Sequence, residues 1–167
     1  MDLTLRLVRH GRTKWNEERR YAGHCDIGLS LQGRTDLEAL TLPETSYASV
    51  VSSDLRRCRE TAAVIGVEPM WERAMREFDF GAIEGRTWDE LDAATQQAMI
   101  DHDGFVAPGG ESVAAFAARI DSFVAGLSAG THLVITHGGV IHELHRREGL
   151  ASSVSPGEWV DLTVSRR

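Results

Sequence analysis

Hydrophobic and polar positions follow two different periods along the chain, and the alternation between them predicts strands followed by helices. Short segments in which leucine, valine or isoleucine alternate with polar residues, or stand together between turn residues, are typical of strands. Apolar residues three or four positions apart are typical of helices that pack one face against a core. The predicted strands are 3–8, 47–53, 67–71, 132–136 and 159–165.

Three serines stand where helix N-caps belong, each in front of apolar residues at helical spacing: Ser30, Ser53 and Ser112. Gly66 is placed to end the helix behind Ser53, because glycine readily adopts the left-handed conformation of a helix end. The helix behind Ser112 is strongly amphipathic. Its apolar face would be formed by Val113, Phe116, Ala117, Ile120, Val124 and Leu127.

Two further helices complete the pattern. Thr87 and Glu90 have the spacing of a capping box, which predicts a helix through Leu91 and Ala98. A last helix is expected over 140–149. Strands that alternate with helices indicate an α/β fold of three layers, α/β/α, in which helices cover both faces of a mostly parallel sheet. No internal repeat or long linker divides the chain, so we expect one domain over residues 1–167.

Charge and composition narrow the function. Lys and Arg number 18 against 25 Asp and Glu, a net charge of −7, which disfavours a general nucleic-acid binder. No apolar run approaches the roughly 20 residues that span a bilayer, and no signal peptide precedes the first strand, so we expect a cytoplasmic protein without membrane contact. Its two cysteines suit a reduced environment. The cations are mainly arginines gathered in clusters, which favours a small anion held in a pocket.

Two histidine–glycine turns follow predicted strands. They are His10-Gly11 and His137-Gly138-Gly139. In a parallel sheet, ligands gather outside the carboxyl ends of the strands, so the two imidazoles converge if these strands are neighbours. A lone histidine is more often structural than catalytic, but two at matching positions favour a catalytic site.

Charged residues near these turns are candidates for the same pocket. Arg9 precedes His10, although neighbouring strand residues point to opposite faces and co-location requires a break in the pleat. Arg57 lies in the first turns of a predicted helix, where the dipole also favours an anion. Arg56 and Arg59 cannot share its direction and are expected to be solvated ion-pairing side chains. The spacing of Glu77 leaves open whether it is a proton donor or an ordinary loop charge.

These residues belong to six sequence blocks in which the chain resembles the histidine phosphatase superfamily, also called phosphoglycerate-mutase-like, almost from end to end. The blocks are Leu7-Val8-Arg9-His10-Gly11-Arg12-Thr13 with Trp15-Asn16; Tyr21-Ala22-Gly23-His24-Cys25-Asp26; Ser52-Ser53-Asp54-Leu55-Arg56-Arg57-Cys58 with Thr61-Ala62; Arg76-Glu77-Phe78-Asp79-Phe80-Gly81 with Glu84-Gly85; Pro108-Gly109-Gly110-Glu111-Ser112; and Thr136-His137-Gly138-Gly139. A single Arg-His-Gly triplet is weak evidence, whereas six blocks in the family's order are specific.

The resemblance implies a role for each matching residue. His10 would be the nucleophile that carries the phosphoryl group, and Glu77 the general acid and base. Arg9, Arg57 and His137 would hold the phosphate oxygens. Secondary phosphate or substrate contacts would come from Asn16, Thr13, Gly23 and Gly138. Fixed cations would replace a metal, so neither a metal nor another cofactor is expected.

The resemblance also implies a substrate class, a small phosphorylated metabolite. The short run 86–111 lacks the inserted segments of the family's mutases, which favours hydrolysis over phosphoryl return. Within the phosphatases, the chain looks most like the α-ribazole-5′-phosphate phosphatases and related broad-specificity phosphatases. Arg12 would add positive charge near the phosphate.

Alternatives remain open. One is phosphoglycerate-mutase-type transfer, and another is a binding module that recognises phosphorylated ligands without turnover. A metalloenzyme based on His142 and His145 is disfavoured because their spacing is three, not the four of a zinc helix, and a polar helix face is the preferred interpretation. The oligomeric state is also open, with a homodimer as one candidate.

Overall fold

The computed structural model describes residues 2–165 and contains a five-stranded sheet. Its strands lie in the order β3-β2-β4-β1-β5. The four strands β1 to β4 pair in parallel, and β5 pairs with β1 in the antiparallel direction. Their bounds are β1 Leu3–Arg9, β2 Ser49–Ser52, β3 Met70–Trp71, β4 Gly130–Thr136 and β5 Trp159–Val164. The predicted mostly parallel sheet is therefore confirmed, with the second and third strands shorter than expected.

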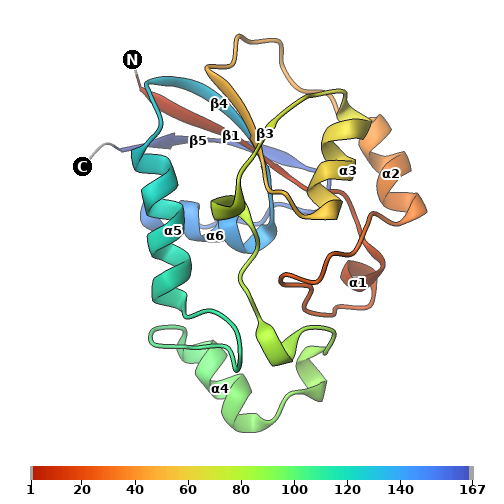
Figure 1. Ribbon diagram of the computed structural model, residues 1–167, viewed down its shortest axis with the longest axis vertical. Helices are drawn as coiled ribbons and strands as arrows, with labels where there is room; N and C mark the ends of the chain where they lie inside the picture. Colours follow the sequence, from red (N-terminus) through yellow and green to blue (C-terminus); the bar gives the residue numbers. More distant parts are fainter. Residues whose placement is uncertain (1, 166–167) are drawn as a thin grey trace.

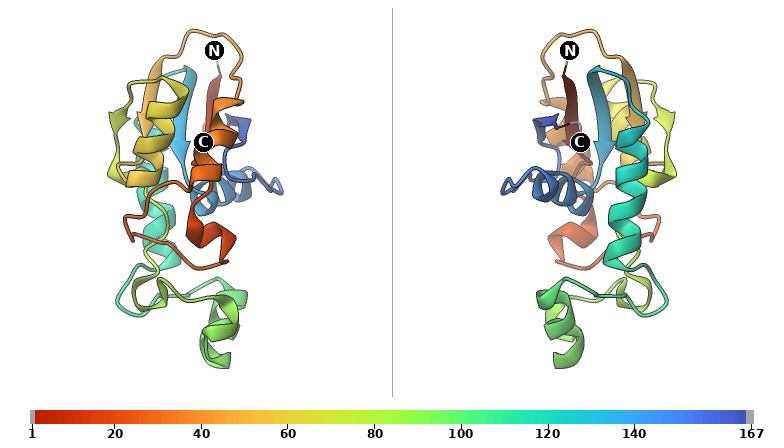
Figure 2. Two further views of the ribbon diagram at one scale, coloured as in Figure 1. Left: turned by 90° about the vertical axis from the view of Figure 1, so that its right-hand side faces the viewer. Right: turned by 90° about the vertical axis from the view of Figure 1, so that its left-hand side faces the viewer.

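Helices cover both faces of this sheet (Figure 1). Helix α3, with α2 beside it, packs on one face, and α5 and α6 pack on the other. A short α1 follows the first strand, and α4 lies apart from the sheet, at the bottom of the view (Figures 1 and 2). The bounds are α1 Lys14–Glu17, α2 Leu31–Glu38, α3 Arg56–Ile65, α4 Ala93–Asp101, α5 Val113–Ala125 and α6 Gly138–Arg147. The three-layer α/β/α arrangement is confirmed.

Neighbouring residues of the central strands supply two separate cores. Val134 of β4 belongs to the core shared with α5 and α6, which includes Ile120 and Leu144. Leu133, one position earlier, belongs to the core beneath α3 together with Ala62. Successive strand side chains point to opposite faces, so a sheet covered on both faces needs apolar residues at consecutive positions. This explains the continuous apolar run of β4.

Most of the predicted helix ends are correct. The Ser30 hydroxyl accepts from the Gly33 N–H at 3.1 Å, and the Ser112 hydroxyl accepts from the Ala115 N–H at 3.0 Å. Gly66 ends α3 with a φ of 74°, the left-handed conformation that glycine adopts without strain. Local capping signals therefore located these ends from the sequence alone.

Two predicted starts are wrong. The N-cap of α3 is Leu55, without a side-chain cap, and the Ser53 hydroxyl contacts His137. The capping box of Thr87 and Glu90 does form, but it begins only a three-residue 3₁₀ turn. Leu91 leaves this turn in an extended conformation that buries its side chain, and Asp92 then caps α4 separately. A long-range hydrogen bond at Ser53 and the burial of Leu91 thus override the local signals.

Candidate active site

The two histidine–glycine turns lie side by side because their strands are neighbours. β1 and β4 are paired in parallel with Arg9 opposite Thr136, so the next residue of each strand is a histidine at the same edge. The His10 N–H donates to the Thr136 carbonyl at 2.9 Å, and the centroids of the His10 and His137 rings are 5.2 Å apart. The structure thus brings together the two imidazoles that the sequence placed at matching strand ends.

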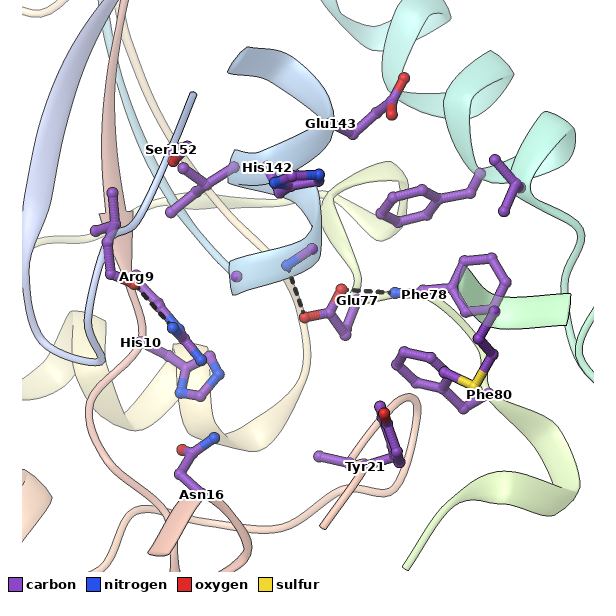
Figure 3. Close-up of a pocket in the computed structure, with 18 of the residues that line it drawn as sticks. Arg9, His10, Asn16, Tyr21, Glu77, Phe78, Phe80, His142, Glu143 and Ser152 are labelled. Atoms are coloured by element: carbon purple, nitrogen blue, oxygen red, sulfur yellow. Dashed lines mark hydrogen bonds between the residues drawn. The ribbon is translucent and has the colours of Figure 1, made fainter. Parts of the chain in front are cut away.

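A cleft of about 580 Å³ opens at this edge of the sheet. Figure 3 shows Arg9 and His10 on one side of the cleft and Glu77 on the other. Arg57 and Asn16 also line it. The remaining wall is mostly apolar and includes Tyr21, Phe78, Phe80, Met99, Phe105, Val113, Phe116 and Ile141. The cleft therefore has a polar end, where these charges meet, and an apolar end.

His10 is held as a neutral imidazole with a defined tautomer. Its Nδ1 lies 2.7 Å from the Gly11 carbonyl oxygen, which can only accept, so Nδ1 carries the proton and Nε2 keeps a lone pair. Burial is the main cause that lowers the pKa of His10 well below its usual range, and Arg57 and Arg9 lower it further. An unprotonated ring nitrogen in this setting is available for nucleophilic attack.

Two guanidinium groups beside His10 lack a carboxylate partner. Arg57 is 1% exposed and donates to the carbonyls of Cys25 at 2.9 Å and Gly23 at 2.7 Å. Arg9 donates to the Val154 carbonyl at 2.8 Å, while its buried Nε has no hydrogen-bond partner among the described residues. Within residues 2–165 neither arginine forms an ion pair with an acidic side chain. Arg57 is buried and Arg9 is half-buried, and cations in such places without an ion-paired carboxylate attract an oxyanion.

His137 contacts Arg57 and does not line the cleft. Its Nδ1 accepts from Nε of Arg57 at 3.2 Å, so Nε2 must carry the proton that it shares with the Ser53 hydroxyl at 2.8 Å. Burial, with Arg57 as the next cause, lowers the pKa of His137 well below its usual range. Both ring nitrogens are thus bonded to protein groups, whereas the family resemblance implies a direct phosphate contact. Ser53 was missed as a site residue because its position resembled an ordinary N-cap.

Glu77 faces His10 across the cleft from the loop behind the 3₁₀ turn Arg73–Met75. Its two carboxylate oxygens accept from the N–H groups of Phe78 at 2.9 Å and Gly139 at 3.0 Å (Figure 3). A Cβ on Gly139 would collide with this carboxylate, and one on Gly138 would lie 3.0 Å from the Arg9 guanidinium carbon. The two glycines therefore leave room for functional side chains of the site itself.

The remaining predicted contacts divide into direct and supporting positions. Asn16 and Gly138 line the cleft. Thr13 is fully buried, does not line the cleft, and exchanges hydrogen bonds with Asn16 through a capping box at the start of α1. Gly23 supplies a carbonyl to Arg57 and has a φ of 48°, and a Cβ there would collide with Glu84.

The other arginines near the site point away from it. Arg12 is exposed, lies 3.8 Å from Asp36 and does not line the cleft, so the expected charge near the phosphate is not supplied by this residue. Arg56 and Arg59 are exposed and lie near carboxylates, as expected. Arg57 alone of this cluster turns inward.

The polar helix face expected around His142 and His145 is wrong. His145 is 5% exposed, and its Nδ1 bonds to the Ile141 carbonyl of the preceding turn. Glu143 is 2% exposed and pairs with Arg146, and both it and His142 are among the residues that line the cleft. Among residues 2–165, no three histidine, cysteine or acidic side chains are grouped so that they could hold a metal ion. No helix of this part of the chain is long and apolar enough to cross a bilayer.

Comparison with known proteins gives consistent matches. The sequence profile of the histidine phosphatase superfamily (branch 1) matches residues 5–154. A Salmonella choleraesuis relative named "Probable phosphoglycerate mutase GpmB" is 33% identical over 153 residues, which cover 81% of this chain and 70% of the relative. A crystal structure of phosphoglycerate mutase from Thermus thermophilus is 38% identical with a TM-score of 0.88, covering 98% of this chain and 97% of that one.

A second solved structure carries a different activity in its name. It is "a putative alpha-ribazole-5'-P phosphatase" from Escherichia coli, 26% identical with a TM-score of 0.84, covering 99% of this chain and 92% of that one. The expected likeness to this branch is therefore present, but at lower identity than the likeness to the Thermus protein.

The two buried imidazoles predict a pH-dependent stability. In the unfolded chain the pKa of His10 and of His137 is about 6.5, whereas in the folded chain the pKa of each is well below that value. Their contribution to the free energy of unfolding is complete above that pH. It should fall, by up to about 3 kcal/mol per pH unit for the pair, as the pH drops from there toward the folded pKa, because only the unfolded chain binds the protons. Urea unfolding across this window measures it, and an undiminished slope in His10→Asn would contradict the assignment.

The unpaired guanidinium groups predict that inorganic phosphate stabilises the fold. Phosphate at about a hundredfold excess over its Kd should add about 3 kcal/mol to the free energy of unfolding. Arg9→Met should remove most of this gain, and the matched variant Arg12→Met should keep it because Arg12 lies outside the cleft. Thermal unfolding with and without phosphate, at constant ionic strength, measures the stabilisation of each variant. Equal shifts in the two variants would show that phosphate binds elsewhere.

Proposed function

Because the chain belongs to the histidine phosphatase superfamily (branch 1), we propose that it hydrolyses a small phosphorylated metabolite through a phosphohistidine on His10. The observation that carries the proposal is the unprotonated Nε2 of His10 in a cleft that Arg9 and Arg57 also line, neither of them ion-paired with a carboxylate among the described residues. Glu77 stands on the opposite wall, where a proton is needed. The same geometry supports a reaction without a metal, since the cations of Arg9 and Arg57 meet the charge of a phosphoryl group.

In the first step, the Nε2 lone pair of His10 attacks phosphorus in line with the ester oxygen. The P–O bond breaks, and the departing oxygen takes the proton of the Glu77 carboxyl group. Arg9 and Arg57 neutralise the equatorial oxygens, while the Gly11 carbonyl stabilises the positive charge that develops on the ring. His137 acts as a positioning residue that holds the Arg57 guanidinium in its plane.

In the second step, water attacks the phosphohistidine. The Glu77 carboxylate takes a proton from this water, the N–P bond breaks, and inorganic phosphate leaves with the electron pair returned to Nε2. Glu77 is then protonated and His10 neutral, as at the start. Asn16 contributes an amide at the cleft wall, and Thr13, Gly23 and Gly138 act by keeping other groups in place.

The apolar end of the cleft supports hydrolysis of an apolar phosphomonoester over mutase chemistry. A phosphoglycerate carries a carboxylate that needs a cation beside the phosphate site. A further arginine in the cleft lining is Arg20, which is already paired with Glu18 and Glu90. The aromatic wall instead suits a flat apolar leaving group. This favours α-ribazole 5′-phosphate, with its benzimidazole base, as the specific substrate.

Hydrolysis of 4-nitrophenyl phosphate in the presence of EDTA tests the mechanism. The wild-type protein should turn over, and His10→Asn should lose about a thousandfold or more, because the nucleophile is removed. His132→Asn is the matched control, since His132 is also buried but bonds to Ser49. Unchanged turnover in His10→Asn would overturn the phosphohistidine. Loss of wild-type activity in EDTA would indicate a metal, and a folded wild type without turnover would favour the binding module.

A substrate comparison tests the finer proposal. The kcat/KM for α-ribazole 5′-phosphate should exceed that for 3-phosphoglycerate by about tenfold or more, because the apolar wall contacts the base. Phe105→Ala should lower this ratio of kcat/KM values. Phe123→Ala, on α5 outside the cleft, should leave the ratio unchanged. A coupled mutase assay gives the opposing outcome: mutase turnover comparable with phosphatase turnover would replace the hydrolase by a mutase.

A further inference from the structure

The segment that carries Glu77 is held largely by one side chain of helix α5, which packs beside it. Arg119 of α5 reaches under the segment and donates from Nη1 to the carbonyls of Ala74 at 2.6 Å and Arg76 at 2.8 Å. Its Nη2 donates to the carbonyl of Glu77 itself at 2.9 Å. The guanidinium carbon also lies 4.7 Å from the centroid of the Phe116 ring, which fixes the plane of the group.

Glu111 completes this arrangement. Its carboxylate accepts from Nε of Arg119 at 2.7 Å and from Nη2 at 3.0 Å. The same carboxylate accepts from the Asp79 N–H at 3.1 Å, on the other side of Glu77 along the chain. Arginine has five N–H donors, and here the three carbonyls and two carboxylate oxygens provide an acceptor for each.

The rest of the segment shows why these bonds matter. Residues 74–77 lie outside the sheet, and their four carbonyls accept from side chains. Thr136 supplies the bond to Met75 at 2.8 Å, and His24 adds a second bond to the Glu77 carbonyl at 2.9 Å. Buried polar groups of the backbone must be satisfied, and these four carbonyls are satisfied by side-chain donors.

We propose that Arg119 and Glu111 are positioning residues for proton transfer by Glu77, an inference that rests on the proposed function. They act through the backbone on both sides of Glu77 and touch neither the phosphate nor the leaving group. Arg119 is absent from the cleft lining, as is Glu111. Without the pair, the carboxyl group would lose its fixed distance to the departing oxygen, and misplacement by about 1 Å is enough to cost about a hundredfold in rate.

Leaving-group dependence distinguishes this role from ordinary structural support. Phenolate leaves poorly and needs a proton, whereas 4-nitrophenolate leaves well without one. The kcat/KM covers only the steps up to departure of the alcohol, so the later action of Glu77 as a base does not enter. Glu77→Gln should therefore lose far more kcat/KM on phenyl phosphate than on 4-nitrophenyl phosphate, and it defines the signature of a missing acid.

Arg119→Met and Arg119→Lys should show the same signature. We expect kcat/KM on phenyl phosphate to fall about tenfold further than on 4-nitrophenyl phosphate, because a lysine cannot reproduce the planar five-donor fork. Glu111→Gln keeps the shape and one acceptor oxygen, so a smaller loss with the same substrate dependence is expected. If an Arg119 substitution unfolds the protein, Glu111→Gln still tests the proposal. Thermal unfolding measures the folded fraction of each variant.

Asp161→Asn is the matched control. It weakens another bidentate arginine–carboxylate pair, with Arg6 at 2.8 Å from both oxygens, on β5 and outside the cleft. In this variant, the ratio of kcat/KM on phenyl phosphate to kcat/KM on 4-nitrophenyl phosphate should stay at the wild-type value. Equal losses on both substrates in Glu111→Gln and the folded Arg119 variants would overturn the positioning role. A Glu77→Gln variant without leaving-group dependence would instead refute the proposed acid, so the two failures are distinguishable.

Discussion

Arg57 is a buried cation without an acidic partner, and the rest of the site is arranged around that charge. Removing a guanidinium group from water costs several kcal/mol unless other groups satisfy it. Here two loop carbonyls, from Gly23 and Cys25, and the Nδ1 atom of His137 accept its hydrogen bonds. The same charge is the second cause, after burial, that lowers the pKa of both His10 and His137. Burial, reinforced by this one charge, thus keeps the two imidazoles neutral.

The acceptors of Arg57 are themselves held by further contacts. The Glu84 carboxylate accepts from the N–H groups of His24 and Cys25, which fixes the loop whose carbonyls face the guanidinium. Gly23 must be a glycine there, both for its positive φ and because Glu84 occupies the space of a Cβ. On the other wall, Arg119 fixes the backbone of Glu77 in a comparable way. Both irregular segments that form the cleft are therefore fixed by charged side chains, which gives loops the rigidity that a catalytic site needs.

Hydrophobic periodicity predicted all five strands, and Ser30 and Ser112 predicted the starts of α2 and α5, because these signals are local. The alternation of strands with helices predicted the three layers. The errors have identifiable causes. Ser53 has the sequence of an N-cap, but its hydroxyl faces His137 on the neighbouring strand end. Glu143 and His145 appear polar in sequence, yet α6 buries both. The roles of the matched site residues come from the family resemblance and stay predictions, as does the single domain over residues 1–167.

The sequence by itself determined where strands end and that a histidine–glycine turn follows two of them. It determined this because apolar alternation, caps and glycines act within a few residues of one another. Only the tertiary structure decided which donor meets which acceptor. The hydrogen-bond partners of Arg57 are separated from it in the sequence by 32, 34 and 80 positions. The backbone carbonyls bound by Arg119 are separated from it by 42 to 45 positions. Such contacts depend on the packing of whole layers, and no local pattern in the chain specifies them.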